Sequence, residues 1–101
     1  MKKIVIIGAG AMGSAFAVPC VDNSNQVFLV GSFLEDKVIE EIKSLNNFHP
    51  ILKSQLPKNI KVLKFSEFNN EIKKNIDLLV VGVSSKGIQW IGDEISKFYN
   101  N

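Results

Sequence analysis

Three glycines near the start of the chain have the spacing of a turn that binds phosphate. Gly8, Gly10 and Gly13 follow the apolar run Ile4–Ile7 in the pattern G-x-G-x-x-G, and small residues suited to a helix come next. The first glycine permits the tight bend, the second leaves room for a pyrophosphate, and the third lets helix and strand pack closely. The N–H groups at the helix start would face the phosphates. The spacing predicts a dinucleotide-binding turn, with a purely structural glycine turn as the alternative.

The residues at the end of the second predicted strand help to indicate whether NAD or NADP is bound. A carboxylate that accepts hydrogen bonds from the ribose normally lies there, but the sequence reads Val30-Gly31-Ser32. Glu35 and Asp36 follow and are interpreted as first-turn residues of the next helix. A 2′-phosphate could be received by Ser32 and neighbouring N–H groups, with Lys37 in range, so the sequence slightly favours NADP over NAD. Ser32 as a plain helix cap is an equal alternative.

Other candidate residues carry weaker signals. The loop Val83-Ser84-Ser85 follows an apolar strand and should face the glycine turn, so Val83 and Ser84 are candidate cofactor contacts, although helix capping explains the serines equally well. Lys86 is interpreted as a solvated surface lysine. His49 has no partner visible in the sequence, and a turn or solvated position is expected for it.

The elements that must position these residues alternate between strand and helix. Apolar runs and helical periodicity give the order βαβαβαβα, which predicts an α/β fold: the Rossmann-like half of a doubly wound parallel sheet, with strands in the order 3-2-1-4 and helices on both faces. Residues 47–59 are expected to form an extended connection, and Ser66 is expected to cap a short helix. The predicted strands are Ile4–Ile7, Val27–Val30, Ile60–Phe65 and Leu78–Val81, and the predicted helices are Ala11–Val21, Leu34–Asn46, a short one after Ser66, and one from Ser85.

Composition narrows the class of protein. A chain of 101 residues with 46% hydrophobic and 22% charged residues is typical of one globular domain. All 12 basic residues are lysines, and the net charge of +2 is spread along the chain, which argues against nucleic acid as a partner. The single cysteine, Cys20, cannot form an internal disulfide. Without a run of eighteen apolar residues, no membrane association is expected, and the cytoplasm is the predicted location.

Four segments together resemble a known family. The runs KIVIIGAGAMGSAFAVP, VFLVGS, HPILKSQLPKNIKVL and DLLVVGVSS are similar to the N-terminal domain of NAD(P)-dependent glycerol-3-phosphate dehydrogenase, and the archaeal form looks nearest. The Asn-x-His-Pro and Leu-Pro-x-Asn elements of the third segment are more discriminating than the glycine pattern. The resemblance implies hydride exchange between a nicotinamide and sn-glycerol 3-phosphate or dihydroxyacetone phosphate.

The resemblance also implies site residues and a division into domains. It carries cofactor contacts to Ala11, Met12 and Ser32, where serine departs from the larger or basic residue usual in the family. The family's two substrate-contacting lysines fall beyond Asn101, so residues 1–101 are expected to form a single dinucleotide-binding domain without the C-terminal substrate domain, and no catalytic residue is assigned. The predicted cofactor-binding residues are Gly8, Gly10, Ala11, Met12, Gly13, Ser32, Val83 and Ser84.

Three other classes of protein are alternatives. A free-standing nucleotide-binding or regulatory module would act through a partner chain, a ketopantoate or F420-linked reductase would share the fold, and a methyltransferase would need a carboxylate after the second strand. No proline or inward charge protects the strand from Leu78 to Val83, so association of two copies through this edge, or poor solubility, is expected.

Overall fold

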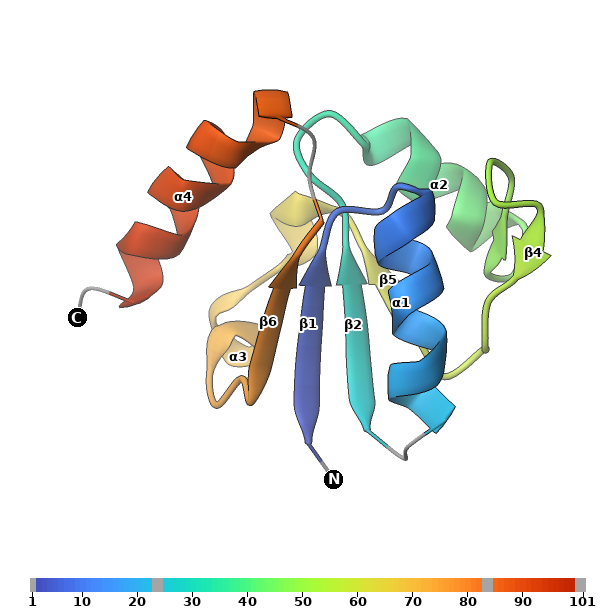
Figure 1. The fold of residues 1–101 in the computed structure, drawn as a ribbon, viewed down its shortest axis with the longest axis horizontal. Helices are drawn as coiled ribbons and strands as arrows, with labels where there is room; N and C mark the ends of the chain where they lie inside the picture. Colours follow the sequence, from blue (N-terminus) through green and yellow to red (C-terminus); the bar gives the residue numbers. More distant parts are fainter. Residues whose placement is uncertain (1, 23–24, 83–84, 100–101) are drawn as a thin grey trace.

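A four-stranded parallel sheet forms the centre of the protein. The computed structural model describes residues 2–22, 25–82 and 85–99. The strands are β1 (Lys3–Ile7), β2 (Gln26–Val30), β5 (Lys61–Leu63) and β6 (Leu78–Val81), and they lie in the order β5-β2-β1-β6 (Figure 1). Every neighbouring pair is parallel, with Ile4 opposite both Val27 and Leu78. When the predicted strands are counted along the chain, this is the predicted order 3-2-1-4, and the fold class is confirmed.

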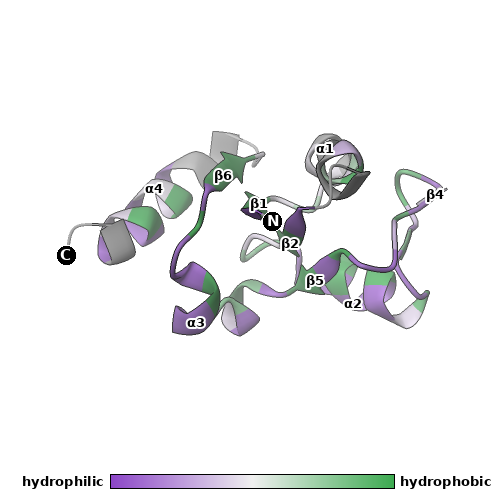
Figure 2. Cartoon of the chain, turned by 90° about the horizontal axis from the view of Figure 1, so that it is seen from below, coloured by the Kyte–Doolittle hydropathy of each residue, from purple (hydrophilic) through white to green (hydrophobic). Residues whose placement is uncertain are grey.

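Helices cover both faces of the sheet because the central strands are apolar on both sides. Ile4 and Ile6 point into one core, which also contains Ile39 and Ile42 of helix α2 (Asp36–Ser44). This core packs against helix α1 (Ala11–Asp22). Val5 and Ile7 point into the other core, with Ile91 of helix α4 (Ser85–Tyr99). Figure 2 shows α1 and the short helix α3 (Asn70–Lys73) on opposite sides of the strands.

The structure differs from expectation in the segment after α2. Residues 47–59 are not simply an extended connection, since strands β3 (Phe48–His49) and β4 (Ser54–Gln55) pair antiparallel in a small hairpin. The expectation that Ser66 caps a helix was wrong, because Ser66 lies inside a 3₁₀ turn, η1 (Phe65–Glu67). Asn69 caps α3 instead, its side-chain oxygen accepting from the Ile72 N–H at 3.0 Å.

The described α-helices are between 4 and 15 residues long. Within the parts of the chain that the structure describes, none of them combines the length and apolarity needed to cross a membrane.

Candidate functional site

The glycine loop between β1 and α1 has a separate structural reason for each of its glycines. Gly8 has φ of 119°, a conformation that favours glycine, and its N–H donates to the Val30 carbonyl at 2.7 Å. A methyl group on Gly13 would overlap the carbonyl oxygen of Gly8. Among the atoms that the structure describes, a methyl group on Gly10 would meet only one within 4 Å, a carboxylate oxygen of Glu35 at 3.9 Å. The first and third glycines thus build the loop, whereas the second leaves open space beside it.

Helix α1 begins directly from this loop. Its first helical hydrogen bond runs from the Ser14 N–H to the Gly10 carbonyl at 3.0 Å, and the buried Ser14 hydroxyl donates to the Ala9 carbonyl at 3.2 Å. Ala11 and Met12 form the first turn, which contains no acidic residue. The N–H groups of a first turn have no acceptor within their own helix and carry partial positive charge. The start of α1 can therefore receive an anionic group above Gly10.

The carboxyl end of β6 reaches the same loop. The Gly82 N–H donates to the Ile7 carbonyl at 2.7 Å, and a methyl group on Gly82 would lie 3.6 Å from the Gly13 Cα. Two of the predicted contacts, Val83 and Ser84, follow this point and lie outside the described residues.

Glu35 differs most from its sequence interpretation. Instead of serving as a first-turn residue, it is the residue that precedes α2, and its side chain turns back toward the glycine loop. Its Oε1 accepts from the Ala9 N–H at 2.9 Å and from the Ser32 N–H at 2.8 Å. The half-buried carboxylate therefore joins the end of β2 to the glycine loop. Residues 30–32 themselves contain no acid, but Glu35 brings a carboxylate to Ser32 from three residues further along the chain.

Ser32 lies at the site, but its N–H and its hydroxyl already form hydrogen bonds within the protein. The residue is 5% exposed, its N–H is bound by Glu35, and its hydroxyl accepts from the Leu34 N–H at 3.4 Å. The Glu35 N–H donates to the Ser32 carbonyl at 3.0 Å. Ser32 thus stabilises the turn that leads into α2.

His49 lies in a different environment from the turn or solvated position that the sequence predicts. It is fully buried, not solvated, with Nε2 2.8 Å from the Ala9 carbonyl and Nδ1 accepting from the Leu52 N–H at 3.1 Å. Because Nδ1 accepts, the proton must be on Nε2, which donates to Ala9. The peptide groups of Ala9 are therefore held by Glu35 at the N–H and by His49 and Ser14 at the carbonyl.

The hairpin that carries His49 is itself fixed by Asn47. The Asn47 side-chain amide donates to the carbonyls of Pro57 and Ile60, each at 3.1 Å, while the Leu56 N–H donates to the Asn47 carbonyl at 2.8 Å. The Asn-x-His-Pro and Leu-Pro-x-Asn elements are thus in direct contact. Together they place His49 next to the glycine loop.

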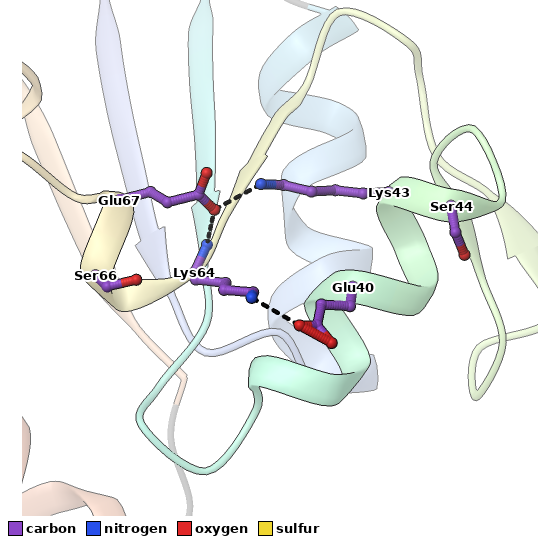
Figure 3. A pocket seen from close by; sticks show the side chains of 6 residues that line it. All are labelled: Glu40, Lys43, Ser44, Lys64, Ser66 and Glu67. Carbon is purple, nitrogen blue, oxygen red and sulfur yellow. Dashed lines mark hydrogen bonds and ion pairs between the residues drawn. The ribbon is translucent and has the colours of Figure 1, made fainter.

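Two surface hollows lie near the other end of α2, and their described lining residues include none from the glycine loop. One is lined by Lys43, Asn46, Asn47 and Lys58. The other, drawn in Figure 3, lies between α2 and η1 and is lined by Glu40, Lys43, Ser44, Lys64, Ser66 and Glu67.

Charges are paired across the second hollow. Lys43 contacts Glu67 at 2.5 Å and Lys64 contacts Glu40 at 2.7 Å (Figure 3). The hydrogen bond from Lys43 lowers the pKa of Glu67, and the hydrogen bond from Lys64 lowers the pKa of Glu40. Because these lysines are neutralised by carboxylates, the hollow is a poor site for an anionic ligand. Within the described part of the chain, no cluster of His, Cys, Asp and Glu could hold a metal ion.

The fold and the glycine loop together define the class of protein. A parallel sheet in this order, with a glycine-rich turn between its first strand and first helix, is the nucleotide-binding half of a Rossmann fold. Residues 3–101 match the family model described as the N-terminus of NAD-dependent glycerol-3-phosphate dehydrogenase. The chain therefore belongs to this family, and the resemblance found in the sequence is confirmed.

Individual relatives come from archaea and bacteria. The chain is 35% identical over 85 residues to the NADP(+)-dependent glycerol-3-phosphate dehydrogenase of Archaeoglobus fulgidus, covering 84% of this chain and 24% of that protein. It is 31% identical over 100 residues to glycerol-3-phosphate dehydrogenase [NAD(P)+] of Mesoplasma florum, and 27% identical over 101 residues to that of Oceanobacillus iheyensis. These matches cover 96% and 100% of this chain and 28% of each relative. The chain thus spans about a quarter of the length of these relatives.

Proposed function

We propose that residues 1–101 are a single NAD(P)-binding domain of a glycerol-3-phosphate dehydrogenase. The observation that carries this proposal is the open space at Gly10, beside a loop whose other two glycines are fixed by backbone geometry. Membership of the family and the names of the relatives support it. A cofactor pyrophosphate would fit over Gly10 because no Cβ fills that space.

The residues proposed to hold the cofactor surround this space. The loop from Gly8 to Gly13, including Ala11 and Met12 at the helix start, would bind the pyrophosphate through backbone N–H groups. Ser32 would lie near the adenosine ribose, and Val83 and Ser84 would approach from the end of β6. The bound nicotinamide would supply the hydride chemistry, and this domain would orient it.

The reaction proposed for the whole enzyme is the interconversion of sn-glycerol 3-phosphate and dihydroxyacetone phosphate. Support comes from the family and from the names of its relatives. We assign no catalytic residue to this chain and propose that a further domain supplies the substrate-binding lysines. A cytoplasmic location stays a prediction of the sequence.

Two arguments about the choice between NAD and NADP point in opposite directions. The sequence slightly favours NADP, and one relative is named as NADP(+)-dependent while two are named for NAD(P)+. The sequence argument depends on the lack of a carboxylate after β2. The position of Glu35 removes that premise, since its carboxylate is bound to the Ser32 N–H.

We also infer that the free edge of β6 pairs with a second strand. β6 is the last strand in the sheet order, and Leu78 and Val81 are 45% and 42% exposed. Exposed apolar edge strands favour pairing with another chain or with a further strand. The partner proposed here is a second copy of this chain or the remainder of a longer enzyme.

Calorimetric titration with NADH and NADPH tests the cofactor proposal. Gly10→Val should abolish saturable binding, because its side chain would fill the space proposed for the pyrophosphate. Gly10 is not in a left-handed conformation, and a Cβ added there meets no described backbone atom within 4 Å, so the variant should still fold. Gly92→Val is the matched control, since a Cβ added there meets no described atom within 4 Å. Equal binding by both variants, or no binding by the folded wild-type chain, would contradict the proposal.

A further inference from the structure

The first three N–H groups of the glycine loop differ in what they bind. The Gly8 N–H donates to the Val30 carbonyl at 2.7 Å, and the Ala9 N–H donates to the Glu35 carboxylate at 2.9 Å. Among the described residues, none accepts a hydrogen bond from the Gly10 N–H. Of these three groups, the Gly10 N–H is therefore the one that can donate to a ligand.

The direction of the Gly10 N–H is set by the carbonyl of the residue before it. The Ala9–Gly10 peptide is trans and planar, so its N–H points away from its C=O. The Ala9 carbonyl faces the interior, where the fully buried side chains of His49 and Ser14 contact it at 2.8 Å and 3.2 Å. The Gly10 N–H must therefore point away from that interior, and Gly10 itself is partly exposed.

His49 links this orientation to a distant part of the chain. It lies 40 residues from Ala9, in the first strand of the small hairpin. Its Nδ1 accepts from the Leu52 N–H at 3.1 Å, so the ring is held at both nitrogens. Rotation of the Ala9–Gly10 peptide would break the bond to Nε2, because a ring held at Nδ1 cannot follow the carbonyl.

We propose that His49 is a positioning residue for cofactor binding, which acts through the Ala9 carbonyl to aim the Gly10 N–H at an oxygen of the pyrophosphate. A donor that is already held in its binding orientation loses less conformational entropy when the ligand arrives, so the affinity is higher. This inference rests on the proposed function and deepens it by naming a residue outside the loop on which cofactor affinity depends.

Calorimetric titration with NADH tests the effect of His49 on affinity. His49→Leu keeps an apolar side chain of comparable size but removes both hydrogen bonds, so the affinity of the folded variant should fall by about tenfold. His49→Gln can still donate to the Ala9 carbonyl and should recover most of the affinity.

Phe68→Leu is the control for lost stability. Phe68 is buried in the core on one face of the sheet, whereas Ala9 belongs to the core on the other face. The NADH affinity of this variant should stay within about twofold of the wild-type value, since distant sites act independently. Wild-type affinity in folded His49→Leu, an equal loss in His49→Leu and Phe68→Leu, or no recovery in His49→Gln would overturn the inference.

The amide resonance of Gly10 distinguishes positioning from a merely structural role without any ligand. In the ¹⁵N-labelled chain this resonance should shift in His49→Leu and return toward its wild-type position in His49→Gln. It should stay in place in Phe68→Leu. A Gly10 resonance that is the same in all of these proteins would contradict the inference, because the peptide would then be oriented without His49.

The tautomer of His49 gives a test in the wild-type chain, which remains decisive if His49→Leu fails to fold. The imidazole ¹⁵N resonances at neutral pH should show a proton on Nε2 and none on Nδ1, because Nδ1 accepts from the Leu52 N–H. The opposite tautomer would overturn the inference, since Nε2 could not donate to Ala9. Unchanged NADH binding in His49→Leu defeats the role of His49 alone, whereas binding of neither NADH nor NADPH by the folded wild-type chain defeats the proposed function as well.

Discussion

At the scale of residues, the peptide groups of Ala9 are the most constrained part of the glycine loop. The side chains of three other residues hold Ala9 in place: Glu35 binds the Ala9 N–H, and His49 and Ser14 bind the Ala9 carbonyl. A buried hydrogen-bonding group left without its partner costs about 1–3 kcal/mol. The loop conformation is therefore maintained by the protein before any ligand binds.

We predict that His49→Ala destabilises the protein by about 2–4 kcal/mol, because it leaves a cavity and removes hydrogen bonds from both Ala9 and Leu52. Urea unfolding at neutral pH measures the free-energy change. His49→Gln should recover part of the loss, since its amide can still donate to the Ala9 carbonyl.

Ile51→Ala is the control for the same hairpin, since Ile51 is 64% exposed and should contribute little. If His49→Ala and Ile51→Ala had equal free energies of unfolding, His49 would not be a support of the glycine loop.

The roles of single residues were the part of the site that sequence could not fully predict. The spacing of Gly8, Gly10 and Gly13 was sufficient to predict the loop, because each glycine answers a local backbone requirement. Glu35 and His49 reach Ala9 from 26 and 40 residues away, so their roles depend on how the strands and the hairpin fold together. A carboxylate roughly twenty residues after the loop was the one signal that pointed to Glu35.

At the scale of elements, strands were predicted well where the sequence has a continuous apolar run. The runs Ile4–Ile7, Val27–Val30 and Leu78–Val81 are continuously apolar, and the structure has strands at all three. The hairpin of β3 and β4 could not be seen, because strands of two residues have no measurable period and depend on the contacts of Asn47 and His49.

The exposed edge of β6 gives a prediction about association. We expect the chain to elute from size-exclusion chromatography as a dimer, with two β6 edges paired across a twofold axis. Leu78→Lys should convert it to a monomer by placing a charge on the edge strand.

Leu45→Lys is the matched control, because Leu45 is 47% exposed, similar to Leu78, but follows α2. A wild-type chain that remains monomeric at every concentration, or a dimer equally disrupted by both changes, would contradict pairing through β6.

At the scale of the whole molecule, the order of the strands determines where the site forms. Strands β2, β1 and β6 end at the same edge of the sheet, so Ser32, the glycine loop and Gly82 come together although they are distant in sequence. Alternation of strands and helices was enough to predict this arrangement, since parallel strands joined by helical crossovers follow a strong rule of handedness.

We expect a dinucleotide to bind at this edge and not at the charged hollows near the other end of α2. The decisive experiment follows the amide chemical shifts of the ¹⁵N-labelled chain during a titration with NADH. The largest changes should occur at Gly8, Gly10, Gly13, Ser32 and Gly82. Changes centred on Lys43, Asn46 and Lys58, with the glycine loop unaffected, would contradict it.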